Sequence, residues 1–329
     1  MGQGFPSRQT VNVVGGRERA VNVRVGDCLW TVDGGRTAQT MVTGVTAVKD
    51  REVVEVVTEH AVFLAAPAQL LGTPDGWAHA ADAVGTVVAW TPARKLCRGR
   101  LTVRPGYEFG YFVGATCSDG SVGRNYVSLV VNDEGFAARY AACLTAATGL
   151  PARLEPITRP SGYLKRDAPG FRVRVVSSYL ADALRQYVGG DAHHMRQRFP
   201  RVVLRDREVF DGFLDGYIDG DGCRLKDGRS RVIVSANTPF LAELARVIGA
   251  RFTARNNGLA SHLVVADSWA TRGTFRPERH PLEPRESHWA EVLDVRRRPM
   301  PVKPFTLYSY RLEPHPTFLV NGHLVREPW

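Results

Sequence analysis

The stretch that decides the fold of this chain reads Phe213-Leu214-Asp215-Gly216-Tyr217-Ile218-Asp219-Gly220-Asp221-Gly222. Gly212, Gly216 and Gly220 recur at i, i+4 and i+8, so one face of a helix ending here has no side chains and can approach a second helix closely. Each helical glycine costs roughly 1 kcal/mol relative to Ala, which close packing must offset. Asp221 ends this helix just before a glycine at the C′ position, where the helix dipole favours a cation.

A second stretch has the same layout and reads Gly110-Tyr111-Phe112-Val113-Gly114-Ala115-Thr116-Cys117-Ser118-Asp119-Gly120. The small residues on its predicted helix face are Gly110, Gly114 and Ser118. Two helices packed through their small faces would bring Asp119 and Asp221 side by side. Paired carboxylates at two negative helix ends favour Mg²⁺, a hard cation that binds oxygen ligands. The alternative is a helix pair that carries no chemistry.

Together the two stretches resemble the LAGLIDADG homing endonucleases. The second matches the motif at Leu214, Gly216, Ile218, Asp219, Asp221 and Gly222. The first matches at Gly114, Asp119 and Gly120. The resemblance implies an α+β endonuclease of pseudo-two-fold αββαββα repeats with two saddle-like antiparallel sheets, which cuts both DNA strands with Mg²⁺ as a monomer. The metal site that it implies consists of Asp119, Asp221, Ser118 and Gly220.

Residues 193–200, which precede the second motif, resemble the family's Lys-x-Ile-Pro phrase, whose Lys supports the active site. Counting back from Pro200, the Lys position holds Gln197, beside Arg198. An Arg can stabilise charge at a phosphate but does not readily give up a proton. The predicted catalytic residues are therefore Asp119, Asp221, Gln197 and Arg198.

The charge balance favours a nucleic-acid partner. The formal net charge is +10, and only five of the 43 basic residues are Lys. Arg makes bidentate contacts with phosphate and guanine. In the family, strand side chains read base edges in the major groove, which predicts contacts to a long asymmetric site in double-stranded DNA. The candidates, each of which could also be plain surface, are Arg153, Arg159, Lys165, Arg166, Arg172, Arg174, Arg224, Lys226 and Arg229.

The flanking sequence predicts short β-strands separated by turns. The stretches at 25–34, 73–80 and 317–325 resemble intein (Hint) domains. The resemblance implies an all-β Hint-like domain into which the endonuclease is inserted. The predicted boundaries are 1–100 for its N-terminal part, 101–279 for the endonuclease (repeats 101–204 and 205–279), and 280–329 for its C-terminal part.

The splicing residues of inteins are missing. The chain begins Met1-Gly2-Gln3 rather than with a Cys or Ser nucleophile, and Gln69 occupies the position of the catalytic His. Gln cannot act as a general acid or base. The expected His-Asn near the C-terminus is replaced, because Arg326 and Glu327 follow Val325. We therefore expect a splicing-inactive module, in which the basic tract 296–304 is a loop.

Five cysteines without a C-x-x-C motif argue against a disulfide scaffold or a zinc knuckle. The N-terminus lacks the apolar core of a signal peptide, and no apolar run approaches transmembrane length. These features predict a cytoplasmic protein without a membrane partner, nucleoid-associated or phage-encoded. Three alternatives remain: a DNA-binding protein of this fold that has lost cleavage, an active intein or Hint autoprocessing domain, and a maturase.

Overall fold

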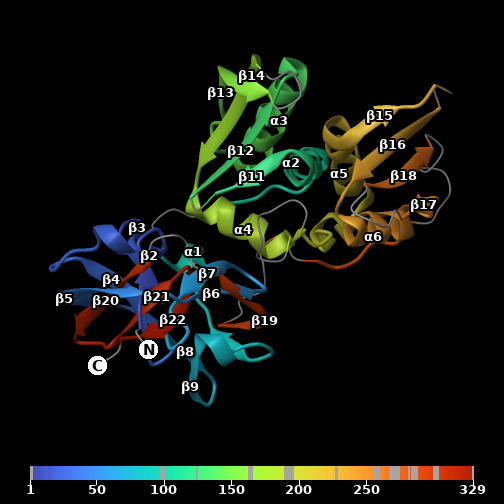
Figure 1. Cartoon of the computed structure of the whole chain (residues 1–329). Helices are drawn as coiled ribbons and strands as arrows, with labels where there is room; N and C mark the ends of the chain where they lie inside the picture. The colour runs from blue at the N-terminus through green and yellow to red at the C-terminus, as the bar shows by residue number, and fades with distance from the viewer. Residues whose placement is uncertain are drawn as a thin grey trace. The chain divides into compact units, whose positions relative to one another are not determined.

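The chain forms two compact units, and each is described on its own (Figure 1). The computed structural model describes residues 3–96, 101–123, 125–161, 166–188, 196–226, 229–254, 260–266, 275–280, 282, 288–298 and 304–327. Unit 1 contains residues 1–100 and 285–329, and unit 2 contains residues 101–188 and 192–284. The second boundary between the units lies between residues 284 and 285, whereas the sequence predicts it between residues 279 and 280.

Unit 1 is built from antiparallel strands with short helical turns. The structure describes sheets of order β1-β20-β5-β4-β2-β3, β10-β19-β6-β7 and β21-β22-β8-β9. The strands are β1 Phe5–Pro6, β2 Thr10–Val13, β3 Gly16–Arg19, β4 Cys28–Asp33, β5 Arg36–Asp50, β6 Val53–Thr58, β7 Val62–Ala65, β8 Leu70–Thr73, β9 Gly76–His79, β10 Val87–Ala89, β19 Trp289–Arg298, β20 Phe305–Glu313, β21 Thr317–Val320 and β22 His323–Arg326. The helical turns are η1 Ala20–Asn22, η2 Ala80–Asp82 and α1 Ala93–Leu96.

Strands from the two ends of the sequence interleave in unit 1. Strand β20 pairs with β1 and β5, β22 pairs with β8, and β19 lies between β10 and β6. Side chains from both ends also share one buried core, to which Phe5, Phe63, Tyr310 and Phe318 contribute. The C-terminal residues therefore complete the sheets that the N-terminal residues begin.

The order helix, two strands, helix, two strands occurs twice in unit 2. The first series is α2 Tyr107–Ser118, β11 Gly120–Val122, β12 Tyr126–Val131, α3 Glu134–Thr148, β13 Arg153–Ser161 and β14 Arg166–Val176, followed by α4 Ser178–Val188. After η4 Arg201–Arg205, the second is α5 Arg207–Asp221, β15 Gly222–Arg224, β16 Ser230–Ser235, α6 Thr238–Ile248, β17 Phe252–Thr253 and β18 Ser261–Ala266. The two sheets have corresponding strand orders, β11-β12-β14-β13 and β15-β16-β18-β17.

Helices α2 and α5 pack backbone to backbone through their glycine faces, as the glycine spacing predicts. A Cβ atom placed at Gly110 or Gly114 would overlap with backbone carbonyl groups of α5. One placed at Gly212 or Gly216 would overlap with carbonyl groups of α2. The glycines are therefore required for the short distance between the helices, and the cost of placing them in a helix is offset by packing.

The sequence indicates that Gly222 ends its helix at the C′ position, but in the structure Gly120 and Gly222 have a different role. Gly222 has φ −104° and ψ 157°, an extended rather than a left-handed conformation. A Cβ there would lie 2.5 Å from the carbonyl oxygen of Ile218, and one at Gly120 would lie 2.6 Å from that of Thr116. Directly after each helix, the backbone turns back against the last helical turn and begins a strand. This turn leaves no room for a side chain at the glycine. The sequence pattern did not predict the first of these strands, β11.

Capping residues begin three of the helices. Asp133 accepts a hydrogen bond from the Phe136 amide (2.7 Å), and Asp206 accepts one from Val209 (2.9 Å). Asn237 caps α6, with Pro239 in the first turn, which is the pattern that these residue types favour at a helix start. The described chain has no helix long and apolar enough to cross a membrane.

The prediction that residues 296–304 form a loop is wrong for residues 296–298, because these residues end strand β19. Their guanidinium groups form ion pairs within unit 1: Arg297 with Glu52 (3.3 Å), and both Arg296 and Arg298 with the buried Glu55. These charges are largely neutralised by partners that lie about 240 residues earlier. Residues 299–303 lie outside the described part of the chain.

Candidate functional site

The structure brings the four predicted metal-site residues together where α2 and α5 end. Asp119 is the C-cap of α2, and Asp221 is the last residue of α5. A Cβ placed at Gly220 would overlap with Ser118 Oγ and Asp119 Oδ2, so the Asp119 carboxylate lies against the backbone of α5. Burial, together with the negative charge of Asp119, raises the pKa of Asp221 to about 7. Two carboxyl groups therefore share one partly buried location.

This carboxylate pair has the oxygen donors that a hard divalent cation prefers. Two negative charges held close together in a partly buried site repel each other, and a divalent cation would relieve that repulsion. Among the described residues, no group of three or more His, Cys, Asp and Glu side chains could hold a metal ion. A cation here would therefore rely on the two carboxylates and keep several water ligands, which is the usual behaviour of Mg²⁺.

Tyr217 orients one member of the pair. Its hydroxyl lies near the Asp221 carboxylate one helical turn later and lowers the pKa of Asp221, by less than burial raises it. Tyr217 is 2 % exposed and stacks on Phe240, with the ring centroids 5.1 Å apart. Packing therefore fixes the phenol ring beside the end of α5.

A second polar cluster, which the sequence patterns did not predict, links α2, α3 and α5. Tyr111 donates to Asp219 Oδ2 (2.7 Å), and Tyr107 donates to Asp215 Oδ2 (2.9 Å). Arg139 from α3 contacts Asp219 (3.2 Å) and Tyr107 Oη (2.7 Å) and lies 4.5 Å from the centroid of the Tyr111 ring. The signal for it was the i, i+4 spacing of the two Tyr and of the two Asp, one position beside the glycine faces.

The two remaining predicted catalytic residues occupy different environments. Gln197 is 3 % exposed, and its backbone carbonyl accepts a hydrogen bond from Asn237 Nδ2 (2.8 Å) at the start of α6. Arg198 is exposed, and its amide donates to the carbonyl of Val188 at the end of α4. Gln197 is thus a buried neutral amide at a junction of helices, and a catalytic role for either residue stays a prediction.

The open face of the sheet β11–β14 carries three of the predicted DNA contacts, Arg153, Arg172 and Arg174, which we call the basic face. Strand alternation puts them opposite the buried Val173 and Val175, which face the helices. Two of the three are oriented by one acid. Arg172 Nε donates to Glu155 (2.6 Å), and Arg153 lies 3.4 Å from the same carboxylate.

Arg174 is held by an aromatic ring. Its guanidinium carbon lies 4.2 Å from the centroid of the Tyr126 ring, a cation–π arrangement. Arg166 is exposed at the start of β14. The side chain of Arg159, and the whole of Lys165, lie outside the described residues.

The predicted contacts of the second sheet are arranged differently. Arg224 pairs with Arg231, which lies 3.4 Å from Asp215 of α5, so the register puts Arg224 on the helix-facing side rather than on the open face. Lys226 and Arg229 are exposed on either side of the hairpin tip, whose residues 227–228 lie outside the described part.

In unit 1, Gln69, at the position that the resemblance to inteins assigns to a catalytic His, has a structural role. Gln69 is 1 % exposed, accepts a hydrogen bond from the Gly4 amide (2.9 Å) and donates one to the Arg326 carbonyl (2.8 Å). It therefore joins the N-terminal and C-terminal segments by hydrogen bonds. The rings of His60 and Trp90 lie with their centroids 4.1 Å apart, at an interplanar angle of 37°.

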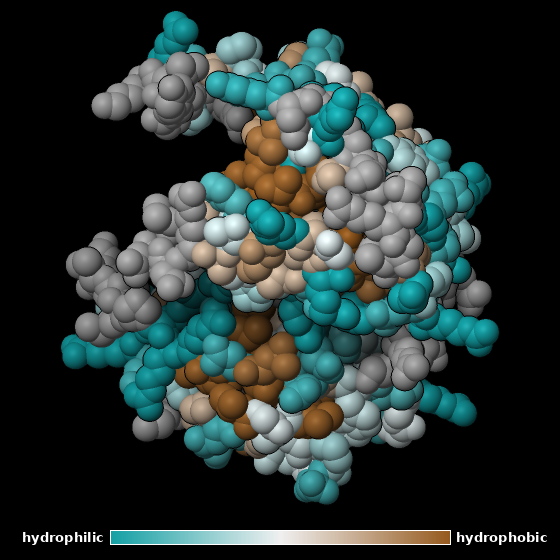
Figure 2. All heavy atoms as spheres, turned by 90° about the vertical axis from the view of Figure 1, so that its right-hand side faces the viewer, coloured by the Kyte–Doolittle hydropathy of each residue, from teal (hydrophilic) through white to brown (hydrophobic). Residues whose placement is uncertain are grey.

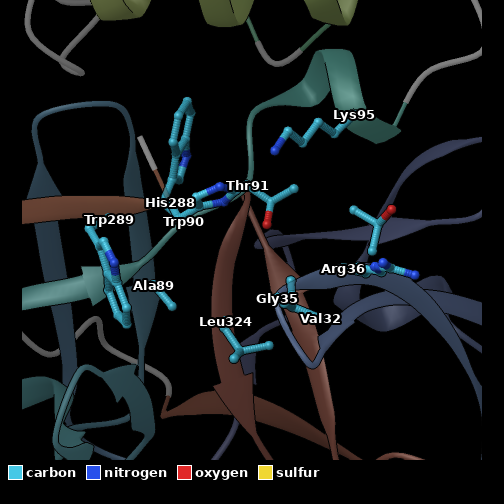
Figure 3. A pocket seen from close by; sticks show the side chains of 11 residues that line it. Val32, Gly35, Arg36, Ala89, Trp90, Thr91, Lys95, His288, Trp289 and Leu324 are labelled. Atoms are coloured by element: carbon cyan, nitrogen blue, oxygen red, sulfur yellow. The ribbon is translucent and has the colours of Figure 1, made fainter. Parts of the chain in front are cut away.

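Unit 1 also contains a pocket of about 830 Å³, shown in Figure 3. Its lining comes from the β4–β5 hairpin, from the segment that follows β10, and from α1, β19 and β22. Trp90, Trp289 and Lys95 are among the side chains that line it. None of the residues predicted to bind metal or DNA is among those that line it.

No protein-family model matches the chain. A curated sequence, the DNA-directed RNA polymerase subunit Rpo1C of Methanocaldococcus jannaschii, is 27% identical over 150 residues, 46% of this chain. The match covers 16% of that subunit, so the chain spans a small part of its length.

Solved structures of two kinds are similar to this chain. One is the homing endonuclease I-WcaI bound to its DNA recognition sequence, at 10% identity, covering 51% of this chain and 78% of that one, with a TM-score of 0.39. Another is a DnaB intein from Synechocystis, at 12% identity, covering 29% and 74%, with a TM-score of 0.27. A bacterial intein-like domain from Clostridium thermocellum has 15% identity, covers 29% and 70%, and has a TM-score of 0.26. At these scores, the chemistry of the site has to be argued from its own residues.

Proposed function

We propose that this protein is a site-specific, Mg²⁺-dependent endonuclease that cuts both strands of DNA, acts as a monomer, and carries a Hint-like unit that no longer splices. The observation that carries the proposal is the carboxylate pair at the ends of α2 and α5. Burial and the charge of Asp119 raise the pKa of Asp221 to about 7, a shift typical of functional carboxylates.

Each part of the proposed site has a separate task. Asp119 and Asp221 would hold the cation from one helix each, and Tyr217 would keep the Asp221 carboxylate oriented toward it. Bound Mg²⁺ would supply activation of water and stabilisation of the leaving oxygen at the scissile phosphate. Arg153, Arg172 and Arg174 would contact DNA phosphates and base edges from the open face of the first sheet.

The same geometry predicts how pH affects cation binding. Because a carboxylate must be ionised to bind a cation, a raised pKa of Asp221 makes binding weaker below about pH 7. Cleavage at limiting Mg²⁺ should therefore increase as the pH rises through that value. Saturating Mg²⁺ should shift the midpoint to lower pH, because bound cation favours the ionised form.

The test is cleavage of a randomised duplex library in Mg²⁺ by the wild type and by Asp221→Asn. A matched control is Asp211→Asn, which lies on the same helix in an exposed ion pair with Arg207 (2.9 Å). Cuts at one long sequence by the wild type and the control, absent with Asp221→Asn, would support the proposal. Equal cutting by all three proteins would refute the role of the carboxylate pair.

A second candidate function is DNA binding without cleavage. The observation that favours it is the burial of Gln197, which puts a neutral amide in the core at the position where the family carries a Lys. Sequence-specific binding with no cuts by any variant would make this candidate the function. An autoprocessing Hint unit is tested separately, since it would change the mass of the expressed chain.

A further inference from the structure

The two sheets of unit 2 lead away from the same place but present different chemistry on their open faces. Strand β11 begins at Gly120, directly after Asp119, and β15 begins at Gly222, directly after Asp221. In both sheets one face packs against helices, so the other face is available to a ligand that passes the carboxylate pair. Each open face would therefore contact the half of the ligand nearest to it, and the side chains of that face select what this half can be.

The open face of β15–β18 is apolar at its centre. Val232, Val234 and Val264 alternate with the buried Ile233 and Leu263 and so face away from the helices. We call these three the apolar face. Val234 and Val264 are 37% and 38% exposed, and Val232 is the cross-strand partner of Val264. Figure 2 views the molecule from the side on which this sheet lies in Figure 1, and exposed apolar residues there are surrounded by hydrophilic ones.

Charged side chains are absent from this open face within the bounds of β15, β16, β17 and β18. Its other members there are Cys223, Ser230, Thr253, His262 and Ala266. The cations stand at the ends of the strands instead: Lys226 follows β15, Arg229 precedes β16 and Arg251 precedes β17. An apolar centre with cations at its rim fits a ligand that is charged at its edges and carries methyl groups in its middle.

The corresponding face of the first sheet has the opposite character. Its centre holds Arg172 and Arg174, fixed by Glu155 and by the Tyr126 ring. A fixed guanidinium group matches the paired acceptors of guanine, O6 and N7. The apolar group that double-stranded DNA presents in its major groove is the C5-methyl of thymine.

We propose that the two halves of the DNA target are read by different chemistry: guanine-containing base pairs by the basic face, and thymine methyl groups by the apolar face. This inference rests on the proposed function, because it describes the substrate of the same site. The rim cations hold the phosphates of the thymine-rich half, which positions the duplex without specifying its sequence.

The competing occupant of the apolar face is a second copy of this chain. Exposed Val side chains on a strand face can also be covered by a partner subunit. Dimerisation is measured by analytical ultracentrifugation at the protein concentration of the binding assay. A dimer that the Val264→Ser variant dissociates would overturn the proposal.

The experiment starts from duplexes that the full-length protein selects by binding in the presence of Ca²⁺. The Arg174→Gln variant identifies the half that the basic face reads, because guanine preference there should fall by at least about five-fold. Thymidine is then replaced by deoxyuridine, which lacks the methyl group, in one half at a time. We expect binding to weaken by about four-fold for each methyl removed from the other half, the factor for burying one such group, and to stay unchanged in the half read by Arg174.

Two variants connect the methyl effect to the protein. Val264→Ser should bring the ratio of thymidine to deoxyuridine affinities to about one, whereas Val87→Ser, an equally exposed strand position in unit 1 (39%), should leave it as in the wild type. A specific target whose deoxyuridine forms bind equally well would overturn this inference and leave the endonuclease proposal intact. Failure to select any sequence would overturn both.

Discussion

Replacing Asp221 with Asn should stabilise the metal-free protein while it abolishes cleavage. The pKa of Asp221 is raised from 3.8 to about 7 by burial and by the charge of Asp119, so the folded state binds this proton more tightly than the unfolded state does. The associated stability is fully present below the unfolded pKa and is lost as the pH rises through about 7. A difference of about three pKa units corresponds to at most about 4 kcal/mol.

The measurement is the free energy of unfolding in urea, with a chelator present, at about pH 5 and about pH 8. Far-UV circular dichroism reports on unit 2, because α2 to α6 lie there and the described helices of unit 1 are single turns. At the higher pH, Asp221→Asn should be more stable than the wild type by up to about 4 kcal/mol, and the difference should shrink at the lower pH. Added Mg²⁺ should stabilise the wild type and leave Asp221→Asn unchanged.

The control for this experiment is Asp211→Asn, since Asp211 is on the same helix in an exposed ion pair with Arg207. Its unfolding free energy should stay within about 0.5 kcal/mol of the wild type, both without and with Mg²⁺. The reasoning is refuted if Asp221→Asn is less stable than the wild type at both pH values, or if the difference between the two proteins does not change with pH. Either result would mean that burial and the charge of Asp119 do not raise the pKa of Asp221 in the folded chain.

Three further substitutions test other parts of the structure. Gly114→Ala puts a methyl group against the backbone carbonyl of Phe213 and should lower the free energy of unfolding of unit 2 by about 3 kcal/mol in the urea titration. Its control is Gly135→Ala near the start of α3, which should be almost neutral. Burial lowers the pKa of His323 to about 3. The free energy of unfolding of unit 1 should therefore fall by about 2 kcal/mol as the pH drops from about 7 to about 5, because the unfolded chain gains the proton in that range. The variant His323→Gln should remove this pH dependence in tryptophan-fluorescence titrations. Gln69→Ala removes hydrogen bonds to both terminal segments and should lower the unfolding free energy of unit 1 by about 2 kcal/mol in the same assay.

Glycine spacing carried the most reliable structural information in this sequence. A glycine at every fourth position records a contact in which no side chain fits, and the overlap at Gly110 and Gly212 is that contact. The pairing of Asp119 with Asp221 followed from it, because each acid directly follows the last turn of its glycine face. The caps were predictable for a similar reason, since a residue such as Asn237 acts on amides within its own turn.

Features that depend on distant partners could not be read from local patterns. The basic run at Arg296–Arg298 resembles a solvated loop until Glu52 and Glu55 are found beside it. Gln197 occupies a position aligned with a catalytic Lys, yet its burial depends on how α4 and α6 meet. The local sequence shows that such a charge or amide is present, but not which residue neutralises or covers it. That neighbouring residue decides whether the group has a structural role or is available to a ligand.

The two acids that end α5 show how neighbours separate residues of one type. Asp219 accepts a hydrogen bond from Tyr111 and lies 3.2 Å from Arg139, so it joins α5 to α2 and α3. Asp221, two residues later, is largely buried and lies near a second carboxylate, and burial together with that charge raises its pKa. A carboxylate already satisfied by a phenol and a guanidinium gains little from a cation, whereas one that faces Asp119 gains a great deal. The contacts of Asp219 keep the helices together against the repulsion between Asp119 and Asp221, and in the proposed function a bound cation would relieve that repulsion.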